Sequence, residues 1–115
     1  MIAGLSGVFH TYGRNPDTMK IRFPQAMLFN LGEWPKETYS GRKPRTRMGT
    51  ASLIREELTA AANFARKKKD NQDADKVPDR DLKREGLAEV LGKKIPAMFC
   101  AQRGDDLLTA LRPTE

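Results

Sequence analysis

The chain is poor in the residues that build most catalytic and metal centres. Its 115 residues include one cysteine, Cys100, and one histidine, His10. A single thiol excludes an internal disulfide framework and an all-thiolate zinc site, and a single imidazole excludes a histidine-rich metal centre. No apolar run approaches the roughly 20 residues that cross a bilayer. We therefore expect a cytoplasmic protein without membrane contact.

The charge balance favours a basic surface. Lys and Arg number 21 and Asp and Glu 15, which gives a formal net charge of +6. Basic clusters at residues 42–47 and 66–69 can neutralise phosphates, so nucleic-acid binding is one alternative function. However, acidic residues follow the second cluster closely, and the sequence has no helix-turn-helix spacing, zinc knuckle or aromatic-rich strand. These features argue against a nucleic-acid partner.

The first half of the chain predicts few regular elements. Small and apolar residues at 4–13 fit a strand that runs into a turn. Pro24 suits a first helical turn, and the apolar stripe that follows it predicts a helix over 24–31. Glycine, proline and arginine recur through 32–49, so this segment is predicted to be a flexible basic loop.

The strongest predicted element is a helix over 51–69. Apolar residues recur there with helical spacing, Thr50 or Ser52 can cap the start, and basic residues lie at the end. The next segment, 70–78, has almost nothing to bury and is predicted to be a polar linker.

The last third of the chain is predicted to form a helix, a strand and a helix. Asp79 or Asp81 can cap the first of these helices. Residues 95–101 are a continuous apolar run of strand length. Asp105 and Asp106 follow, and we expect one of them to cap the final helix.

The strand at 95–101 determines the predicted fold class. A strand without polar alternation that lies between helices is typical of a parallel sheet covered on both faces. One such strand cannot build that sheet, and the chain offers only two or three strand candidates. We therefore predict a single partial α/β domain over residues 1–115, which is helix-rich and belongs to a larger fold.

Three blocks of the sequence carry patterns that occur together in one enzyme family. Residues 22–39 read RFPQAMLFNLGEWPKETY, similar to P-x-A-L-x-x-x-L-G-E-x-P-K-x-x-Y. Residues 44–58 read PRTRMGTASLIREEL, similar to P-x-T/S-R-M-G-x-A-x-L-x-R-E. Residues 87–112 read LAEVLGKKIPAMFCAQRGDDLLTALR, similar to L-x-x-V-L-x-x-K-I-P-x-x-x-H-A-H-R-A-D-D-I-L-T-A-L-R. These three blocks, taken together and in this order along the chain, resemble metal-dependent amidohydrolases of the imidazolonepropionase-like branch.

The resemblance implies a (β/α)₈ TIM barrel and a hydrolytic reaction. In that family, zinc or another divalent metal at the carboxyl ends of the strands activates water. The water attacks a non-peptide carbon–nitrogen bond, such as that of a cyclic amide, in a small-molecule substrate. A full barrel takes about 250 residues, and the family's early His-x-His strand and its later His and Asp strands have no counterpart here. We therefore expect a truncated, inactive fragment of the barrel.

Both histidines of the H-A-H-R part of the third family pattern are replaced in this chain. Where the pattern reads H-A-H-R, residues 100–103 read Cys-Ala-Gln-Arg, so the resemblance places Cys100 at the metal-binding position. A thiolate binds zinc but needs further ligands, and the alternative interpretation is a small buried residue that ends a strand. A looser alignment places His10 near a metal-bridging lysine of some relatives. The alternative for His10 is a histidine without a metal.

Four charged residues complete the predicted site. The resemblance implies that Arg103 orients the substrate and that Asp106 helps to shape the mouth around Cys100. Arg45 and Arg47 can anchor a carboxylate-bearing substrate through their fork-shaped donors, or they can lie on a solvated loop.

A non-catalytic role competes with hydrolysis. The missing metal ligands favour a docking fragment that binds the remaining segments of a barrel or a second copy of itself. An incomplete barrel exposes strand edges and apolar helix stripes, and both favour self-association.

Overall fold

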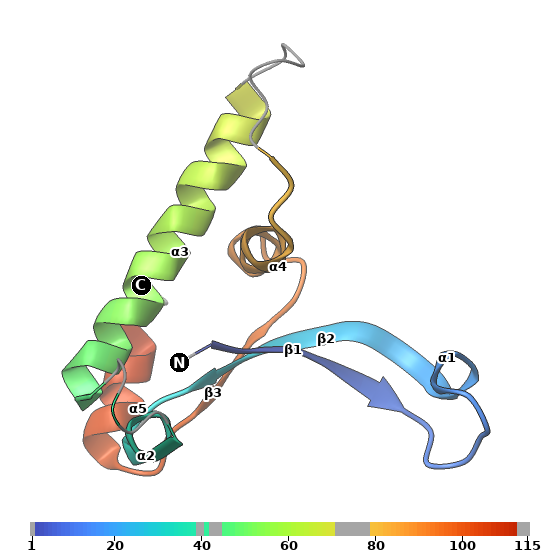
Figure 1. The fold of residues 1–115 in the computed structure, drawn as a ribbon, viewed down its shortest axis with the longest axis horizontal. Helices are drawn as coiled ribbons and strands as arrows, with labels where there is room; N and C mark the ends of the chain where they lie inside the picture. The colour runs from blue at the N-terminus through green and yellow to red at the C-terminus, as the bar shows by residue number, and fades with distance from the viewer. Residues whose placement is uncertain (1, 39–40, 42–44, 71–78, 113–115) are drawn as a thin grey trace.

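The structure, a computed structural model, describes residues 2–38, 41, 45–70 and 79–112. Within them, three strands form one sheet and five helices accompany it (Figure 1). The elements, in chain order, are β1 (Ile2–Phe9), α1 (Pro16–Met19), β2 (Lys20–Asn30), α2 (Glu33–Thr38), α3 (Arg47–Asp70), α4 (Leu82–Leu91), β3 (Ala97–Cys100) and α5 (Gly104–Leu111). This confirms the predicted mixed α/β class.

The sheet has the strand order β1-β2-β3 and mixes both kinds of pairing. β1 and β2 form an antiparallel hairpin in which Phe9 pairs with Lys20. β2 and β3 are parallel, with Asn30 opposite Cys100, so their carboxyl ends lie together. The parallel pairing that the sequence predicts is thus confirmed for β2 and β3, whereas β1 is antiparallel.

The prediction of a helix over 24–31 is wrong, because residues 24–30 form the second half of β2 and Leu31 follows the strand directly. Met27 and Phe29 alternate along the strand and face α3 and α4 in the core, and Leu28 between them points to the other face. The spacing of a short apolar run buried on both sides fits a helix as well as a strand. Pairing with two neighbouring strands decides between them.

The basic loop predicted over 32–49 is interrupted by α2 and ends early, because α3 begins at Arg47. Thr46 caps α3, since its hydroxyl oxygen accepts the Gly49 N–H at 3.0 Å. The predicted caps were Thr50 and Ser52, but both lie inside the helix. Thr50 is fully buried, and its hydroxyl donates to the Thr46 carbonyl at 3.3 Å. Residues 39–40 and 42–44 lie outside the described part of the chain.

The predicted helix and strand that follow are confirmed. One carboxylate oxygen of Asp81 accepts the N–H groups of Lys83 at 3.1 Å and Arg84 at 3.3 Å, so Asp81 caps α4. β3 lies within the strand predicted at 95–101. Most of the polar linker predicted at 70–78 lies outside the described residues.

The core lies between the sheet and the helices α3 and α4. Phe29, Ile54 and Leu87 are almost fully buried there, one from β2 and one from each helix. Gly86 lets α4 approach the sheet, because a Cβ at that position would lie 3.2 Å from the Met27 methyl carbon. A side chain at position 86 would therefore require the Met27 methyl group to shift.

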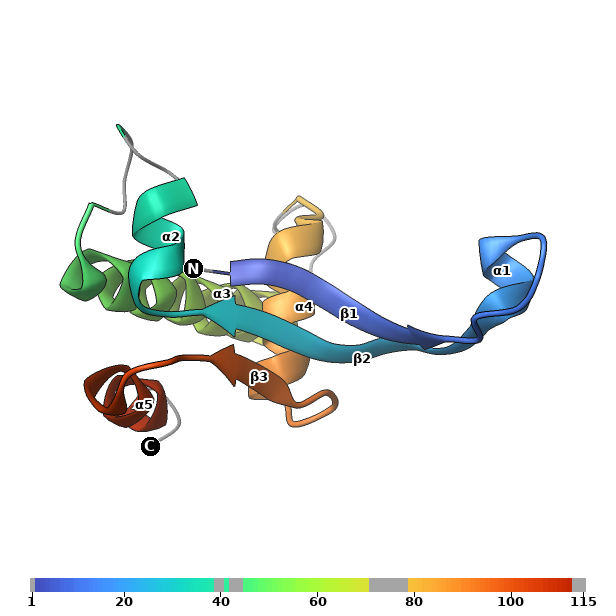
Figure 2. The ribbon, with the colours of Figure 1, turned by 90° about the horizontal axis from the view of Figure 1, so that it is seen from below.

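The other face of the sheet is open beside β3. Met98 is 54% exposed, and Cys100, two residues further on, is also exposed. The expectation that helices cover both faces is therefore wrong for the described residues. Figure 2 shows β3 along one margin of the sheet and the β1–β2 hairpin extending away from the helices toward α1. No described helix is both long and apolar enough to span a membrane.

Candidate functional site

The candidate site lies where β2 and β3 end side by side. Asn30 and Cys100 are paired across the two strands, and the Leu31 N–H donates to the Cys100 carbonyl at 2.9 Å. α5 begins only four residues after Cys100, at Gly104. The carboxyl ends of parallel strands are where α/β proteins bind ligands, because the loops that follow the strands converge there.

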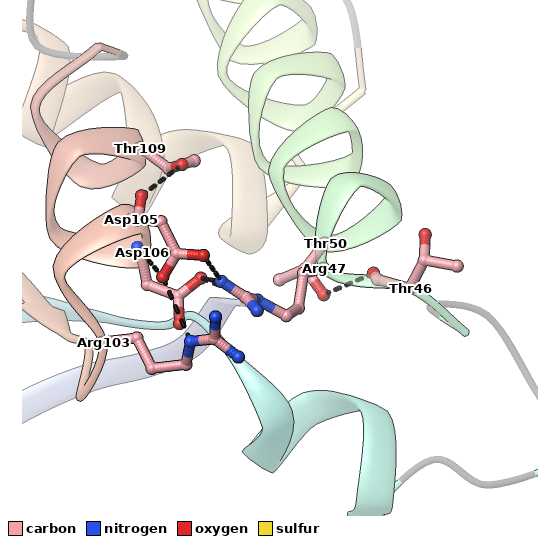
Figure 3. A network of polar contacts seen from close by, with 7 residues as sticks. All are labelled: Thr46, Arg47, Thr50, Arg103, Asp105, Asp106 and Thr109. Atoms are coloured by element: carbon pink, nitrogen blue, oxygen red, sulfur yellow. Dashed lines mark hydrogen bonds and ion pairs between the residues drawn. The ribbon is translucent and has the colours of Figure 1, made fainter.

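A network of charged side chains joins α3 to α5 beside these strand ends (Figure 3). Arg47, the first residue of α3, donates from Nε to Asp106 Oδ1 at 3.0 Å. Its Nη2 donates to Asp105 Oδ2 and lies 3.0 Å from Asp106 Oδ1. One guanidinium therefore binds two neighbouring carboxylates in the first turn of α5.

The two carboxylates have different surroundings. The Asp106 side chain is only 8% exposed, whereas that of Asp105 is 53% exposed. The hydrogen bond from Arg47 lowers the pKa of Asp105 below its usual value, and Arg103 adds a smaller coulombic effect of the same sign. The pKa of Arg47 is raised in turn, chiefly by its hydrogen bond to Asp105. Both shifts favour the charged forms of Asp105 and Arg47.

Gly32 brings the loop after β2 into the same network. Its φ of +86° is a conformation that residues with a side chain rarely adopt. A Cβ on Gly32 would lie 2.9 Å from Asp106 Oδ2, so the buried carboxylate packs directly against the glycine. Asp106 thus connects three segments: the end of β2, the start of α3 and the start of α5.

The predicted capping of α5 by Asp105 or Asp106 is wrong. Arg103 occupies the cap position and makes no side-chain capping bond. The Asp105 carboxylate accepts the N–H of Asp106 at 3.1 Å, but both aspartates lie inside the helix. Binding to Arg47 is what fixes these two carboxylates, and their place in the first turn suits the helix dipole.

The structure brings three of the predicted site residues together. Arg103 Nε lies 3.3 Å from Asp105 Oδ1, so Arg103 adjoins the network that Arg47 and Asp106 form. Arg45 is exposed and belongs to none of these contacts. The guanidinium of Arg47, predicted as an anchor for a substrate carboxylate, already binds two carboxylates of the chain itself.

Cys100 and His10, the two predicted metal ligands, lie at opposite ends of β2. Cys100 is exposed beside Asn30, where β2 ends. The His10 N–H donates to the Met19 carbonyl at 2.7 Å, next to the start of β2. Since β2 has 11 residues, it spans about 35 Å at about 3.3 Å per residue. One metal centre cannot include both side chains.

The residues present do not fit a complete metal centre. In the part of the chain that the structure describes, no three His, Cys, Asp or Glu side chains are grouped so that they could hold an ion. Cys100 offers one thiol, and the nearby carboxylates of Asp105 and Asp106 are bound to Arg47. A zinc ion takes at least three protein ligands, so further ligands would have to come from outside these residues.

A solved structure matches this arrangement over almost the whole chain. It is the crystal structure of an amidohydrolase from Thermotoga maritima MSB8, with a TM-score of 0.91 and 38% sequence identity. The chain is amidohydrolase-like. The match covers 98% of this chain and 30% of the Thermotoga chain. No family model and no curated protein matches the sequence.

The match supports the resemblance of this chain to the amidohydrolase family. The chain spans less than a third of the length of the Thermotoga protein. Three features of this amidohydrolase-like chain were missed in the sequence: the pairing of Asn30 with Cys100, the contact of Gly32 with Asp106, and the binding of Asp106 by Arg47. The sequence did offer one signal for the last two contacts. Gly32, Arg47 and Asp106, which make them, come one each from the three blocks that resemble the family.

Proposed function

We propose that the chain forms part of a metal-dependent hydrolase of the imidazolonepropionase-like branch of amidohydrolases. Such an enzyme cleaves non-peptide carbon–nitrogen bonds, as in cyclic amides, of a small-molecule substrate. The likeness of 98% of the chain to an amidohydrolase at 38% identity carries this proposal. The order of the three sequence blocks supports the branch.

In this proposal, the chain supplies two adjacent parallel strands of a TIM barrel and the helices that cover them. β2 and β3 would form part of the barrel wall, and their carboxyl ends would face the substrate. Arg103, 63% exposed beside the strand ends, would orient the substrate. Arg47 and Asp106 would hold the loops that carry the site, because they already bind each other.

The isolated chain is not expected to hydrolyse a substrate. The family's metal supplies activated water, and the described residues do not assemble the ligands to hold that metal. The proposed activity therefore belongs to an assembly in which other segments provide the missing ligands.

A chimera tests the proposal. The matched segment of the Thermotoga amidohydrolase is replaced by this chain, once with Cys100 and once with Cys100→His, which restores the first histidine of the H-A-H-R pattern. We expect the Cys100→His chimera to hold zinc and to hydrolyse cyclic amides, the Cys100 chimera to hold less zinc, and the isolated chain to show no turnover. The readouts are metal content by mass spectrometry and hydrolysis of a panel of cyclic amides.

A folded Cys100→His chimera that neither binds zinc nor hydrolyses any cyclic amide of the panel contradicts the proposal. The native Thermotoga amidohydrolase, purified and assayed in parallel, is the positive control for metal loading.

A further inference from the structure

One edge of β3 has no strand beside it in the described residues. β3 pairs with β2 alone, and the carbonyls of Pro96, just before β3, and of Cys100, at its end, accept the N–H groups of Met27 at 3.0 Å and Leu31 at 2.9 Å. Because backbone groups alternate along a strand, those of Ala97 and Phe99 point to the opposite edge. An open edge of this kind is a template for an incoming strand.

An apolar groove lies next to this edge, on the side of the sheet that α3 and α4 cover. Its volume is about 470 Å³, and Leu58 of α3, Val90 of α4 and Phe99 of β3 contribute to its lining. Phe99 stacks on the buried Phe29 with ring centroids 4.9 Å apart, so the groove is continuous with the core. A helix laid in it would extend the apolar packing of the core.

The open edge and the groove fit one strand–helix unit. When a strand, a crossover helix and a parallel strand follow one another, the connection is right-handed, so successive helices lie on the same side of the sheet. β2, the helices α3 and α4, and β3 already follow this path. A further parallel strand beside β3 would bring its helix to the same side, where the groove lies.

The charge at the groove disfavours a second copy of this chain as the occupant. Lys93 and Lys94 line it, and neither ammonium group is ion-paired to a carboxylate among the residues described. In a symmetric dimer two copies of the same groove come together, and none of the residues that line it carries a carboxylate to pair with these lysines. A partner with carboxylates beside its apolar helix complements them.

We propose that the β3 edge and this groove dock a strand–helix unit from the remainder of an amidohydrolase-like chain, with carboxylates facing Lys93 and Lys94. The Thermotoga protein has such a remainder, since 70% of its chain has no counterpart here. The inference rests on the proposed family but not on catalysis, because docking needs neither a metal nor a substrate.

Co-expression tests the docking. The probe is the Thermotoga amidohydrolase with its matched segment replaced by a short Gly/Ser linker, and the full 115-residue chain carries an affinity tag. We expect the two to co-purify as a one-to-one complex, measured by light scattering after size exclusion. A probe that is soluble only when this chain is present is the same positive result.

Three variants localise the contact. Ala97→Pro removes an edge N–H that β2 does not use, and we expect it to weaken the complex at least tenfold. Lys94→Glu reverses a charge at the groove and is expected to weaken it severalfold. Lys20→Glu makes the same charge change at the far end of β2, and binding is expected to stay unchanged. Circular dichroism checks that each variant folds.

The possible results are distinct. No complex, or a probe that is insoluble with and without the chain, overturns the proposal, as does a complex that Lys94→Glu and Ala97→Pro leave unchanged. A homodimer of the chain that Ala97→Pro dissociates would show that a second copy occupies the edge instead. Zinc content and turnover of the complex are measured separately, so docking without hydrolysis refutes the proposed function alone.

Discussion

At the scale of single residues, Arg47 binds two carboxylates that should contribute very differently to stability. Asp106 is almost buried and packs against Gly32, whereas Asp105 is half exposed. An exposed ion pair contributes little, because water solvates both charges well when they separate. The Asp106 carboxylate is almost buried and the Arg47 side chain is 25% exposed, so bonds lost between them are replaced by water only in part.

Replacing Asp106 by alanine should therefore lower the free energy of unfolding by about 2 kcal/mol, the range for hydrogen bonds to charged groups. Asp105→Ala, which removes the neighbouring carboxylate from the same guanidinium, is the matched control and should cost much less. Urea denaturation of the three proteins measures both differences. Equal losses would show that Asp106 is not the stabilising partner.

The lowered pKa of Asp105 predicts a dependence of stability on pH. A carboxyl group whose folded pKa lies below its unfolded value stabilises the fold when it is ionised. The contribution is therefore fully present above the unfolded pKa of 3.8 and is lost as the pH falls through the lower folded pKa. We expect the melting temperatures of wild type and Asp105→Asn to differ at neutral pH and to converge on acidification. A gap that widens toward low pH would reverse the sign and contradict this assignment.

At the scale of helices and strands, prediction from the sequence succeeds for helices that have a clear capping residue. It fails for a strand that is buried on both faces. Asp81 was predicted as a possible cap from its type and position, and the structure confirms it. Residues 24–31 were predicted as a helix because Pro24 suits a first helical turn and a short apolar stripe follows it, but residues 24–30 belong to β2. Only its pairing with β1 and β3, which lie far apart in the chain, reveals the strand.

The same limit applies to the site. Arg47 was predicted from its fork-shaped donors and Arg103 and Asp106 from the family resemblance, one by one, and the structure brings the three together. The binding of Asp106 by Arg47 was not predicted, because 59 positions separate the two residues and no local pattern records such a contact. Residue types near a strand end can be read from sequence, but their mutual bonds depend on the packing of α3 against α5.

The cap of α4 can be tested directly. Asp81→Ala leaves the N–H groups of Lys83 and Arg84 without their carboxylate acceptor, and should lower the free energy of unfolding by about 1 kcal/mol. Asp79→Ala removes the same charge two residues earlier, at an exposed position outside the helix, and should change stability little. If the two variants lose the same stability, net charge and not capping is responsible.

At the scale of the whole molecule, the β1–β2 hairpin joins a packed half to an exposed half. Near the ends of β2 and β3, Met27 and Phe29 are buried under the helices. Toward α1, Phe9, Ile21 and Phe23 are each about half exposed, although all three are apolar. The strand pairing shifts register between the two halves, where Ser6 pairs with Ala26 and Val8 with Arg22, so the halves differ in backbone pairing as well as in packing.

Hydrogen exchange of two backbone amides should reveal this difference. The His10 N–H donates to the Met19 carbonyl at 2.7 Å in the exposed half, and the Leu31 N–H donates to the Cys100 carbonyl at 2.9 Å in the packed half. If bond length governed protection, His10 would exchange more slowly. We expect the opposite, by at least tenfold, because exchange follows local opening and the hairpin end can open without disturbing the core. Native-state exchange by NMR compares the two amides in one sample. Equal protection would mean that the hairpin opens only when the whole molecule unfolds. The packing of the core would then stabilise the exposed end of the hairpin as well.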